Sequence, residues 1–245
     1  MRLGDARTPE SMRLYAIGDV HGCLGRLQSL HGLIADDLDA HPTPDHRIIH
    51  VGDYCDRGPD SAGVLEYLAF LAATRTDMAF LRGNHDEKLM QFLSTPDDVA
   101  ATFLGYGGDA TLRSYGCTVR NGQSPAALAQ DAAGRIPDAH LDFLRGTELS
   151  LWLGDYFFCH AGARPHVPLA EQAEVDLLWI REEFLWSEFA FEAVVVHGHT
   201  VAQTPETRPN RINVDTGAVF GGPLTAVVLE GSGYRFLSVD QADSA

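Results

Sequence analysis

The chain of 245 residues is 45% hydrophobic and 21% charged, a balance that is typical of folded globular proteins and excludes a disordered one. Its 18 basic and 34 acidic side chains leave a formal net charge of −16, which argues against a protein that coats nucleic acid or an anionic membrane, because both need dense positive charge. No apolar run is long enough to span a membrane, and the four dispersed cysteines indicate free thiols. We therefore expect a cytoplasmic protein with no nucleic-acid or membrane partner.

The first half of the chain alternates predicted strands and helices. Residues 1–12 are polar and lack an apolar stretch of the signal-peptide kind, so we expect a flexible tail there and a single domain over 13–245. Short apolar runs predict three strands, at 13–17, 47–51 and 78–81. Each is followed by a helical pattern, at 24–38, at 59–71 and from 86 onward. This repetition predicts parallel strands with crossover helices, an arrangement in which ligands bind at the carboxyl ends of the strands.

The second half has a different character. Residues 96–148 are rich in Ala and Leu and are interrupted by glycines, which predicts a helical insertion made of several short helices. Six short β-runs follow, at 149–153, 156–159, 193–197, 211–214, 224–229 and 235–239. Tight turns separate most of them, so we expect an antiparallel sheet with hairpins.

Polar clusters follow five of the predicted strands. They are Gly18–Gly22 (GDVHG), Gly52–Gly58 (GDYCDRG), Arg82–Asp86 (RGNHD), Cys159–Gly162 (CHAG) and His197–Thr200 (HGHT). Carboxylate, imidazole and carboxamide groups together are ligands for transition metals such as Mn, Fe or Zn. A single Gly-Asp after a strand is usually a turn, but five such clusters at strand ends are hard to explain as turns. The pattern predicts a site for two metal ions that share a carboxylate.

In the order and spacing of these clusters the chain resembles the calcineurin-like metallophosphoesterases. Within that family it is similar to the phosphoprotein phosphatase branch, and above all to the small bacterial and phage serine/threonine phosphatases of the lambda-phosphatase type. Two further stretches support that branch, Leu178–Arg181 (LWIR) and Asp215–Phe220 (DTGAVF). The resemblance implies a four-layer α/β/β/α sandwich with two mixed β-sheets, a dimetal site at the strand ends, and the 96–148 insertion near that site.

The resemblance also implies a role for individual residues. Two divalent metal ions per chain would be bound, with Mn²⁺ as the first choice and Fe or Zn as alternatives. Their ligands would be Asp19, His21, Asp53, Asn84, His160 and His199, with Asp53 bridging the two ions. The proton donor to the leaving group would be His85, oriented by Asp56. The substrate phosphate would be bound by Arg57 and Arg181, with support from Arg82.

These features predict a dinuclear-metal phosphomonoesterase that hydrolyses phosphoserine and phosphothreonine in proteins, with phosphotyrosine as a further option. The reaction would be a direct attack on phosphorus by a metal-bridging hydroxide, without a phosphoenzyme. The expected partners are phosphorylated proteins or phosphopeptides, and the expected product is inorganic phosphate.

Two other functions stay open. Asp86 stands where protein phosphatases usually have Glu and diadenosine tetraphosphate hydrolases often have Asp, so hydrolysis of dinucleoside polyphosphates is the alternative. Asp56 and the LWIR stretch favour the protein phosphatase instead. A catalytically inactive phosphoprotein-binding module is disfavoured because no predicted metal ligand is missing.

Overall fold

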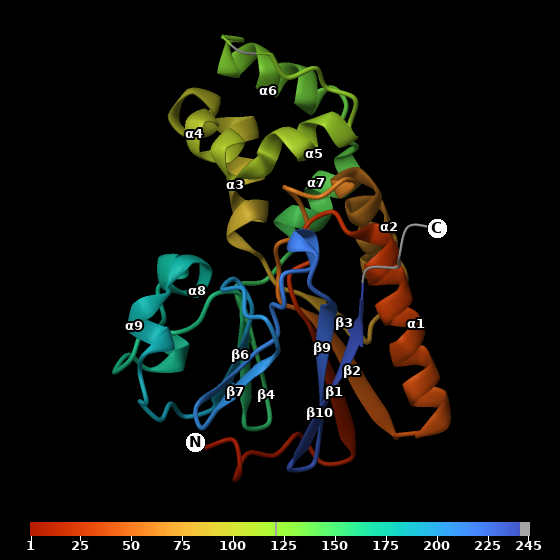
Figure 1. Ribbon diagram of the computed structural model, residues 1–245, viewed down its shortest axis with the longest axis vertical. Coiled ribbons are helices and arrows are strands. Elements are labelled where there is room, and N and C mark those ends of the chain that lie inside the picture. Colours follow the sequence, from red (N-terminus) through yellow and green to blue (C-terminus); the bar gives the residue numbers. More distant parts are fainter. Residues whose placement is uncertain (121, 241–245) are drawn as a thin grey trace.

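Two five-stranded β-sheets pack face to face in the computed structural model, which describes residues 1–120 and 122–240 (Figure 1). In spatial order, the first sheet consists of β10 (Gly233–Val239), β9 (Leu224–Glu230), β1 (Met12–Ile17), β2 (Asp45–His50) and β3 (Met78–Phe80). The second sheet consists of β4 (Ser150–Leu153), β5 (Tyr156–Cys159), β6 (Val194–His197), β8 (Arg211–Asn213) and β7 (Glu206–Arg208). Each sheet contains both parallel and antiparallel pairs, so the predicted mixed sheets are confirmed.

Strand side chains alternate between two hydrophobic cores because successive residues of a strand point to opposite faces. In β1, Leu14 and Ala16 pack between the sheets, whereas Tyr15 and Ile17 pack under the helices outside the first sheet. In β6, Val195 lies in a third core outside the second sheet. The three cores separate four layers, which confirms the predicted α/β/β/α sandwich.

Helices cover both outer faces and one end of the sandwich. The first sheet is covered by α1 (Leu24–Ala40) and α2 (Ser61–Thr74), and the second by α8 (Glu174–Trp179) and α9 (Glu182–Leu185). Above the sheets lie α3 (Asn84–Ser94), α4 (Pro96–Phe103), α5 (Asp109–Ser114), α6 (Pro125–Ala133) and α7 (Asp138–Arg145) (Figure 1). A π-helical turn, Leu104–Gly108, joins α4 to α5, and 3₁₀ turns lie at Leu169–Glu171 and Ala218–Phe220. No helix in the described ranges is both long and apolar enough to cross a membrane.

The second half of the chain departs from the predicted hairpin sheet. β5 pairs with β6 and β6 with β8 in parallel, because the long connection from β5 to β6 carries α8 and α9 over the sheet as a crossover. β9 and β10 do form a hairpin, but it joins the first sheet beside β1. β7 was not predicted, because its three residues are polar and form no apolar run.

The amino-terminal residues pack on the sandwich, which differs from the predicted flexible tail. Leu3 and Ala6 are buried in the core between the sheets, and the N–H of Leu3 donates to the carbonyl of Pro209 at 2.7 Å. Two apolar side chains in a polar segment are enough to anchor it. Residues 241–245 of the predicted domain and residue 121 of the 96–148 segment lie outside the described residues.

Acid is expected to weaken the fold through a pair of histidines between α1 and β2, of which His31 is half-buried and His50 is buried. The His31 Nε2 lies 3.2 Å from the His50 Nε2, and burial, together with Arg75, lowers the pKa of His31 to about 4. In the unfolded chain a histidine takes up its proton near pH 6.5. Between these values only the unfolded state is protonated at this position, so stability is complete above about pH 6.5 and falls as the pH drops towards 4. His31→Gln should therefore reduce the loss of unfolding free energy between about pH 7.5 and about pH 5 by about 2 kcal/mol.

Urea unfolding with EDTA at the two pH values measures this effect. The control is the same comparison between about pH 8.5 and about pH 7.5, where a histidine is unprotonated in both states and the two proteins should lose equal stability. An equal loss in the His31→Gln and wild-type proteins over the acidic range would contradict the prediction.

Candidate metal centre

Five polar clusters meet at the end of the two sheets that lies beneath the helical layer. Asp19 and His21 follow β1, and Asp53 follows β2. Asn84 and His85 open α3 directly after β3, while His160 and His199 follow β5 and β6 of the second sheet. All these side chains are buried. Because the strands that carry them are parallel neighbours within each sheet, their carboxyl ends bring the clusters together.

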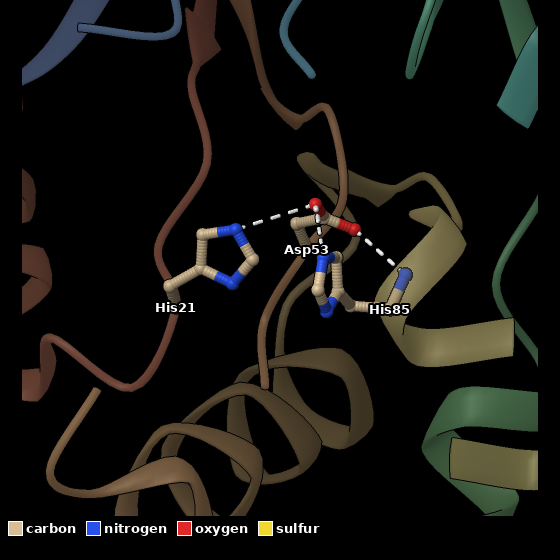
Figure 2. A group of neighbouring side chains, drawn as sticks. All are labelled: His21, Asp53 and His85. Carbon is tan, nitrogen blue, oxygen red and sulfur yellow. Dashed lines mark hydrogen bonds and ion pairs between the residues drawn. The ribbon is translucent and has the colours of Figure 1, made fainter. Parts of the chain in front are cut away.

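Asp53 lies at the centre of two groups of ligand atoms. Its Oδ2 is 3.4 Å from the Nε2 of His21 and 4.0 Å from that of His85 (Figure 2). Its Oδ1 faces the other way and is 3.4 Å from the Nε2 of His160. Within each group, His21–Asp53–His85 and Asp53–His160–His199, the ligand atoms lie within 4.8 Å of one another. One carboxylate thus serves both groups, which is the arrangement of a bridging ligand.

The histidines present unprotonated nitrogens to this space. The Nδ1 of His21 lies 2.7 Å from the carbonyl of Cys55, and the Nδ1 of His160 lies 3.0 Å from that of Val51. A ring nitrogen that faces a carbonyl oxygen must carry the proton, so each Nε2 is left with a lone pair. The Nε2 of His199 is buried without any hydrogen-bond partner. The Nε2 of His160 and the Oδ1 of Asn84, both acceptors in this tautomer, face each other at 2.8 Å. This donor set fits a cation.

The buried carboxylates also favour bound cations, because their negative charges lie close together. Burial, reinforced by the charges of Asp215 and Asp53, raises the pKa of Asp19 well above its ordinary value. Burial acts in the same direction on Asp53, but the imidazoles around it, His160 first, hold its pKa below the usual range. Buried carboxylates so close together are costly unless cations neutralise them. The residues therefore fit a centre for two divalent ions.

Backbone strain is concentrated at this centre. Seven residues other than glycine have a positive φ in the described chain, a conformation that side chains with a Cβ rarely adopt. Five of the seven belong to the predicted site: His21, Asp53, Asp56, Arg57 and His199. Such strain persists only where the surrounding contacts impose it, and it is characteristic of functional sites.

His85 and Asp56 form a buried pair beside the ligand groups. The Nδ1 of His85 lies 2.7 Å from the Oδ2 of Asp56, whose Oδ1 accepts a hydrogen bond from the hydroxyl of Thr111 at 2.7 Å. Burial on its own would lower the pKa of His85, but the carboxylates of Asp53 and Asp56 outweigh it and raise that pKa. The protonated imidazole is thereby favoured, with its Nε2 4.0 Å from the Oδ2 of Asp53.

The three predicted phosphate-binding arginines differ in position. The Nη1 of Arg57 lies 2.7 Å from the Nε2 of His21, inside the centre. Arg181 lies at its edge, where its Nη1 donates to the Thr200 hydroxyl at 3.3 Å. The guanidinium of Arg82 points elsewhere: it binds the Thr147 hydroxyl at 3.1 Å, the Glu87 carboxylate at 3.2 Å and two carbonyls. These contacts occupy its donors, so the expected support of the phosphate by Arg82 is not seen, and the residue braces the end of β3.

Two residues outside the predicted site shape the loops that carry it. Asp86 is fully buried and accepts hydrogen bonds from the backbone N–H groups of Gly83, Asp53 and Tyr54 at 2.8–2.9 Å. Burial and the charge of Asp53 raise the pKa of Asp86 to about 7. Thr111, from the 96–148 segment, holds Asp56 as described. The place of Asp86 in the RGNHD cluster marked it as a candidate functional residue. The sequence could not show that its carboxylate accepts three hydrogen bonds from two different loops.

Gly198 leaves room for the carboxylate of Asp19, one of the predicted metal ligands. A Cβ at this position would lie 2.1 Å from the Oδ1 of Asp19, which also accepts the backbone N–H of His199 at 3.1 Å. We expect Gly198→Ala to displace Asp19 and to weaken Mn²⁺ binding by about 10- to 100-fold, the effect of disturbing the groups that orient a ligand. Titration calorimetry on the metal-free protein measures the affinity. Gly32→Ala in α1, where a Cβ meets nothing within 4 Å, should bind like the wild type. Unchanged affinity in the Gly198→Ala protein would refute the placement of Asp19.

Comparisons with known proteins agree with this geometry. The profile of the calcineurin-like phosphoesterase family matches residues 12–221. A curated relative from Bacillus thuringiensis (strain Al Hakam), named bis(5'-nucleosyl)-tetraphosphatase PrpE, asymmetrical, is 27% identical over 236 residues and covers 88% of this chain and 90% of its own. A solved structure provisionally described as a diadenosine tetraphosphatase has a TM-score of 0.64 at 21% identity and covers 95% of this chain and 98% of that one. A protein serine/threonine phosphatase from Saccharomyces cerevisiae has a TM-score of 0.60 at 13% identity, with 96% and 82% covered.

The expectation of a protein serine/threonine phosphatase is wrong. The curated relatives that span most of this chain are named as dinucleoside tetraphosphatases, whereas the structural likeness to a protein phosphatase, at 13% identity, shows the fold alone. The motifs behind the expectation describe the metal ligands and the histidine–aspartate pair, and these do not report what is attached to the phosphate. The departure at Asp86 pointed to the other class.

Proposed function

Because this chain belongs to the calcineurin-like phosphoesterase family of metal-dependent hydrolases, we propose that it hydrolyses dinucleoside polyphosphates such as diadenosine tetraphosphate. The observation that carries the proposal is the central position of Asp53 between two groups of buried ligands. The names of the curated relatives support the substrate class. As in their names, we expect asymmetrical cleavage, which divides four phosphates into three and one.

In this proposal two divalent ions, with Mn²⁺ as the first choice, would be held at the centre. Asp19 and His21 would bind one ion, Asn84, His160 and His199 the other, and Asp53 both, while His85 beside the first ion would be kept for proton donation. Bound there, the ions would supply Lewis acidity, which withdraws electron density from the phosphoryl oxygens and acidifies water near neutral pH.

The departing nucleotide needs a proton, which a residue beside the metal ligands is positioned to donate. As a water oxygen bonds to phosphorus, the P–O bond to the departing nucleotide breaks and its oxygen takes the electron pair. His85, protonated at Nε2 and held through Nδ1 by Asp56 at 2.7 Å, is positioned to donate a proton to that oxygen. Asp56 lies on the far side of the ring from the substrate and is a positioning residue.

Arg57 and Arg181 provide fixed positive charge for the phosphoryl oxygens. A guanidinium offers paired N–H donors that match two oxygens of a phosphate. Arg57 reaches the centre beside His21, and its position depends on the 96–148 segment, because its backbone N–H donates to the carbonyl of Gly107 at 3.0 Å. The helical layer thus contributes to phosphate binding through Gly107 and to acid catalysis through Thr111.

Chromatography of nucleotide products tests the proposed function. The Mn²⁺-supplied protein should convert diadenosine tetraphosphate into ATP and AMP in equal amounts, and EDTA should stop the reaction. The control is a phosphopeptide at the same concentration, from which phosphate release should be much slower. Intact diadenosine tetraphosphate together with rapid release of phosphate from the peptide would refute the proposal.

A further inference from the structure

A pair of neighbouring cavities extends from the metal centre along the second sheet. The larger has a volume of about 580 Å³, within the range of small-molecule sites, and the smaller one about 260 Å³. Both are lined by Leu185, Trp186, Arg208 and Arg211, and we call this shared region the Arg–Trp groove. The smaller cavity also includes Thr200, the residue after His199 and the hydrogen-bond partner of Arg181. The groove therefore begins at the edge of the metal centre.

The Arg–Trp groove is cationic in a protein whose net charge is −16. Three arginines, Arg2, Arg208 and Arg211, line the larger cavity, against one acidic residue, Glu188, and the smaller cavity adds Glu206, which pairs with Arg208. Within the described part of the chain, no carboxylate lies within ion-pair distance of Arg2. In the whole chain acidic residues outnumber basic ones almost two to one, so this local excess of positive charge is the opposite of the average charge balance. It favours an anionic ligand.

Arg211 is the buried member of the three, and its charge is only partly compensated. It is only 5% exposed, and its Nη atoms bind the carbonyl of Leu185 at 2.5 Å and the Oδ1 of Asn210 at 3.3 Å. Its Nε is buried without a partner. The Glu206 carboxylate stands 3.9 Å away and is already paired with Arg208. A buried guanidinium without a close counter-charge is costly, and a phosphate in the adjoining cavity would supply that charge.

Trp186 supplies an unpaired aromatic face beside these arginines. It is 82% exposed and lines both cavities, and none of the described aromatic rings packs on it. By contrast, Trp152 packs against Phe157 and donates to the carbonyl of Gly154. An exposed indole next to arginines is the combination that binds a nucleobase by stacking and its phosphates by charge.

We propose that the Arg–Trp groove binds a nucleoside polyphosphate, with the base stacked on Trp186 and the phosphates on Arg208 and Arg211. In the hydrolysis of dinucleoside tetraphosphates, the groove would hold the nucleotide half that is farther from the metals. That orientation rests on the proposed function. The existence of the nucleotide site does not, so it can be tested without turnover.

Calorimetric titration of the metal-free protein with ATP and with inorganic triphosphate tests the site. Trp186→Ala should weaken ATP binding by about 10- to 100-fold through the loss of stacking, while triphosphate binding changes little. Arg208→Glu should weaken the binding of both by about tenfold or more, because it replaces an attraction for phosphate with a repulsion. The tryptophan control is Trp152→Ala, on β4 and outside both cavities, which should bind ATP like the wild type.

Three results would overturn the inference: no binding of ATP, equal affinity for ATP and triphosphate, or equal weakening by Trp186→Ala and Trp152→Ala. These failures differ from a failure of the proposed function. Hydrolysis of diadenosine tetraphosphate without ATP binding to the metal-free protein would refute the groove alone. Binding of ATP that depends on Trp186, without hydrolysis of diadenosine tetraphosphate, would refute the function and keep the site.

Discussion

Replacing Asp53 with Asn is expected to lower kcat/KM for diadenosine tetraphosphate by about a thousandfold or more, the size of losing several kcal/mol of charge stabilisation in the transition state. The reason is that one carboxylate faces both ligand groups, with Oδ2 3.4 Å from His21 and Oδ1 3.4 Å from His160. Asn keeps the shape and can still accept the backbone N–H of His85, so the fold should survive. Chromatographic rates and the bound metal measured after dialysis both report the effect.

Thermal unfolding separates lost metal binding from lost catalysis. A metal at about 100 times its Kd stabilises a protein by about 2.7 kcal/mol, so Mn²⁺ should raise the Tm of the wild type and not that of the Asp53→Asn protein. Asp39→Asn, at an exposed position of α1, is the matched control and should change neither rate nor metal content. Retention of two Mn²⁺ ions by the Asp53→Asn protein would disprove the bridging role.

The second large effect is expected from His85→Asn, and it should depend on the leaving group. A departing phenolate, with a pKa of about 10, needs a proton more than a departing phosphate, with a pKa of about 6. We expect kcat for phenyl phosphate to fall by about 10² to 10⁴, the usual contribution of a general acid. The fall should be only about tenfold for 4-nitrophenyl phosphate or diadenosine tetraphosphate, whose leaving groups are more acidic. Steady-state rates across this series measure the dependence.

The partner of His85 provides the control. Asp56→Asn should lower kcat by less than His85→Asn does, and the double variant should be no slower than His85→Asn alone, because Asp56 acts only through the ring it holds at 2.7 Å. An equal fall for all leaving groups would instead point to metal binding by His85, whose Nε2 also approaches Asp53.

Local patterns predicted most of the elements because strands and helices reflect periodicity within a few residues. The apolar run of β1 and the helical spacing of Leu27, Leu30 and Ile34 in α1 are visible in the chain itself. Pairing partners are not local. The sequence shows short apolar runs after residue 149 but does not show that β5, β6 and β8 pair in parallel, since that depends on where α8 and α9 carry the chain.

The site follows the same division. The residues that the family resemblance assigned as metal ligands lie close together, and Asp56 contacts His85. This was predictable because the clusters that carry these residues follow strands whose carboxyl ends meet at one edge. The fate of Arg82 could not be predicted in this way, because its partner Thr147 lies 65 residues along the chain. The same holds for Thr111, 55 residues from Asp56.

By itself the sequence determined the chemistry of this protein: a net charge of −16, a set of carboxylates and imidazoles suited to divalent ions, and their positions after strands. These are properties of residue identity and local spacing. Only the tertiary structure decided which groups share Asp53, which of the predicted arginines lie beside them, and that three arginines and Trp186 gather in one groove beside the centre. Such contacts join residues far apart in the chain, for example Asp19 and His199, which are 180 positions apart, and they are set by the packing of the two sheets.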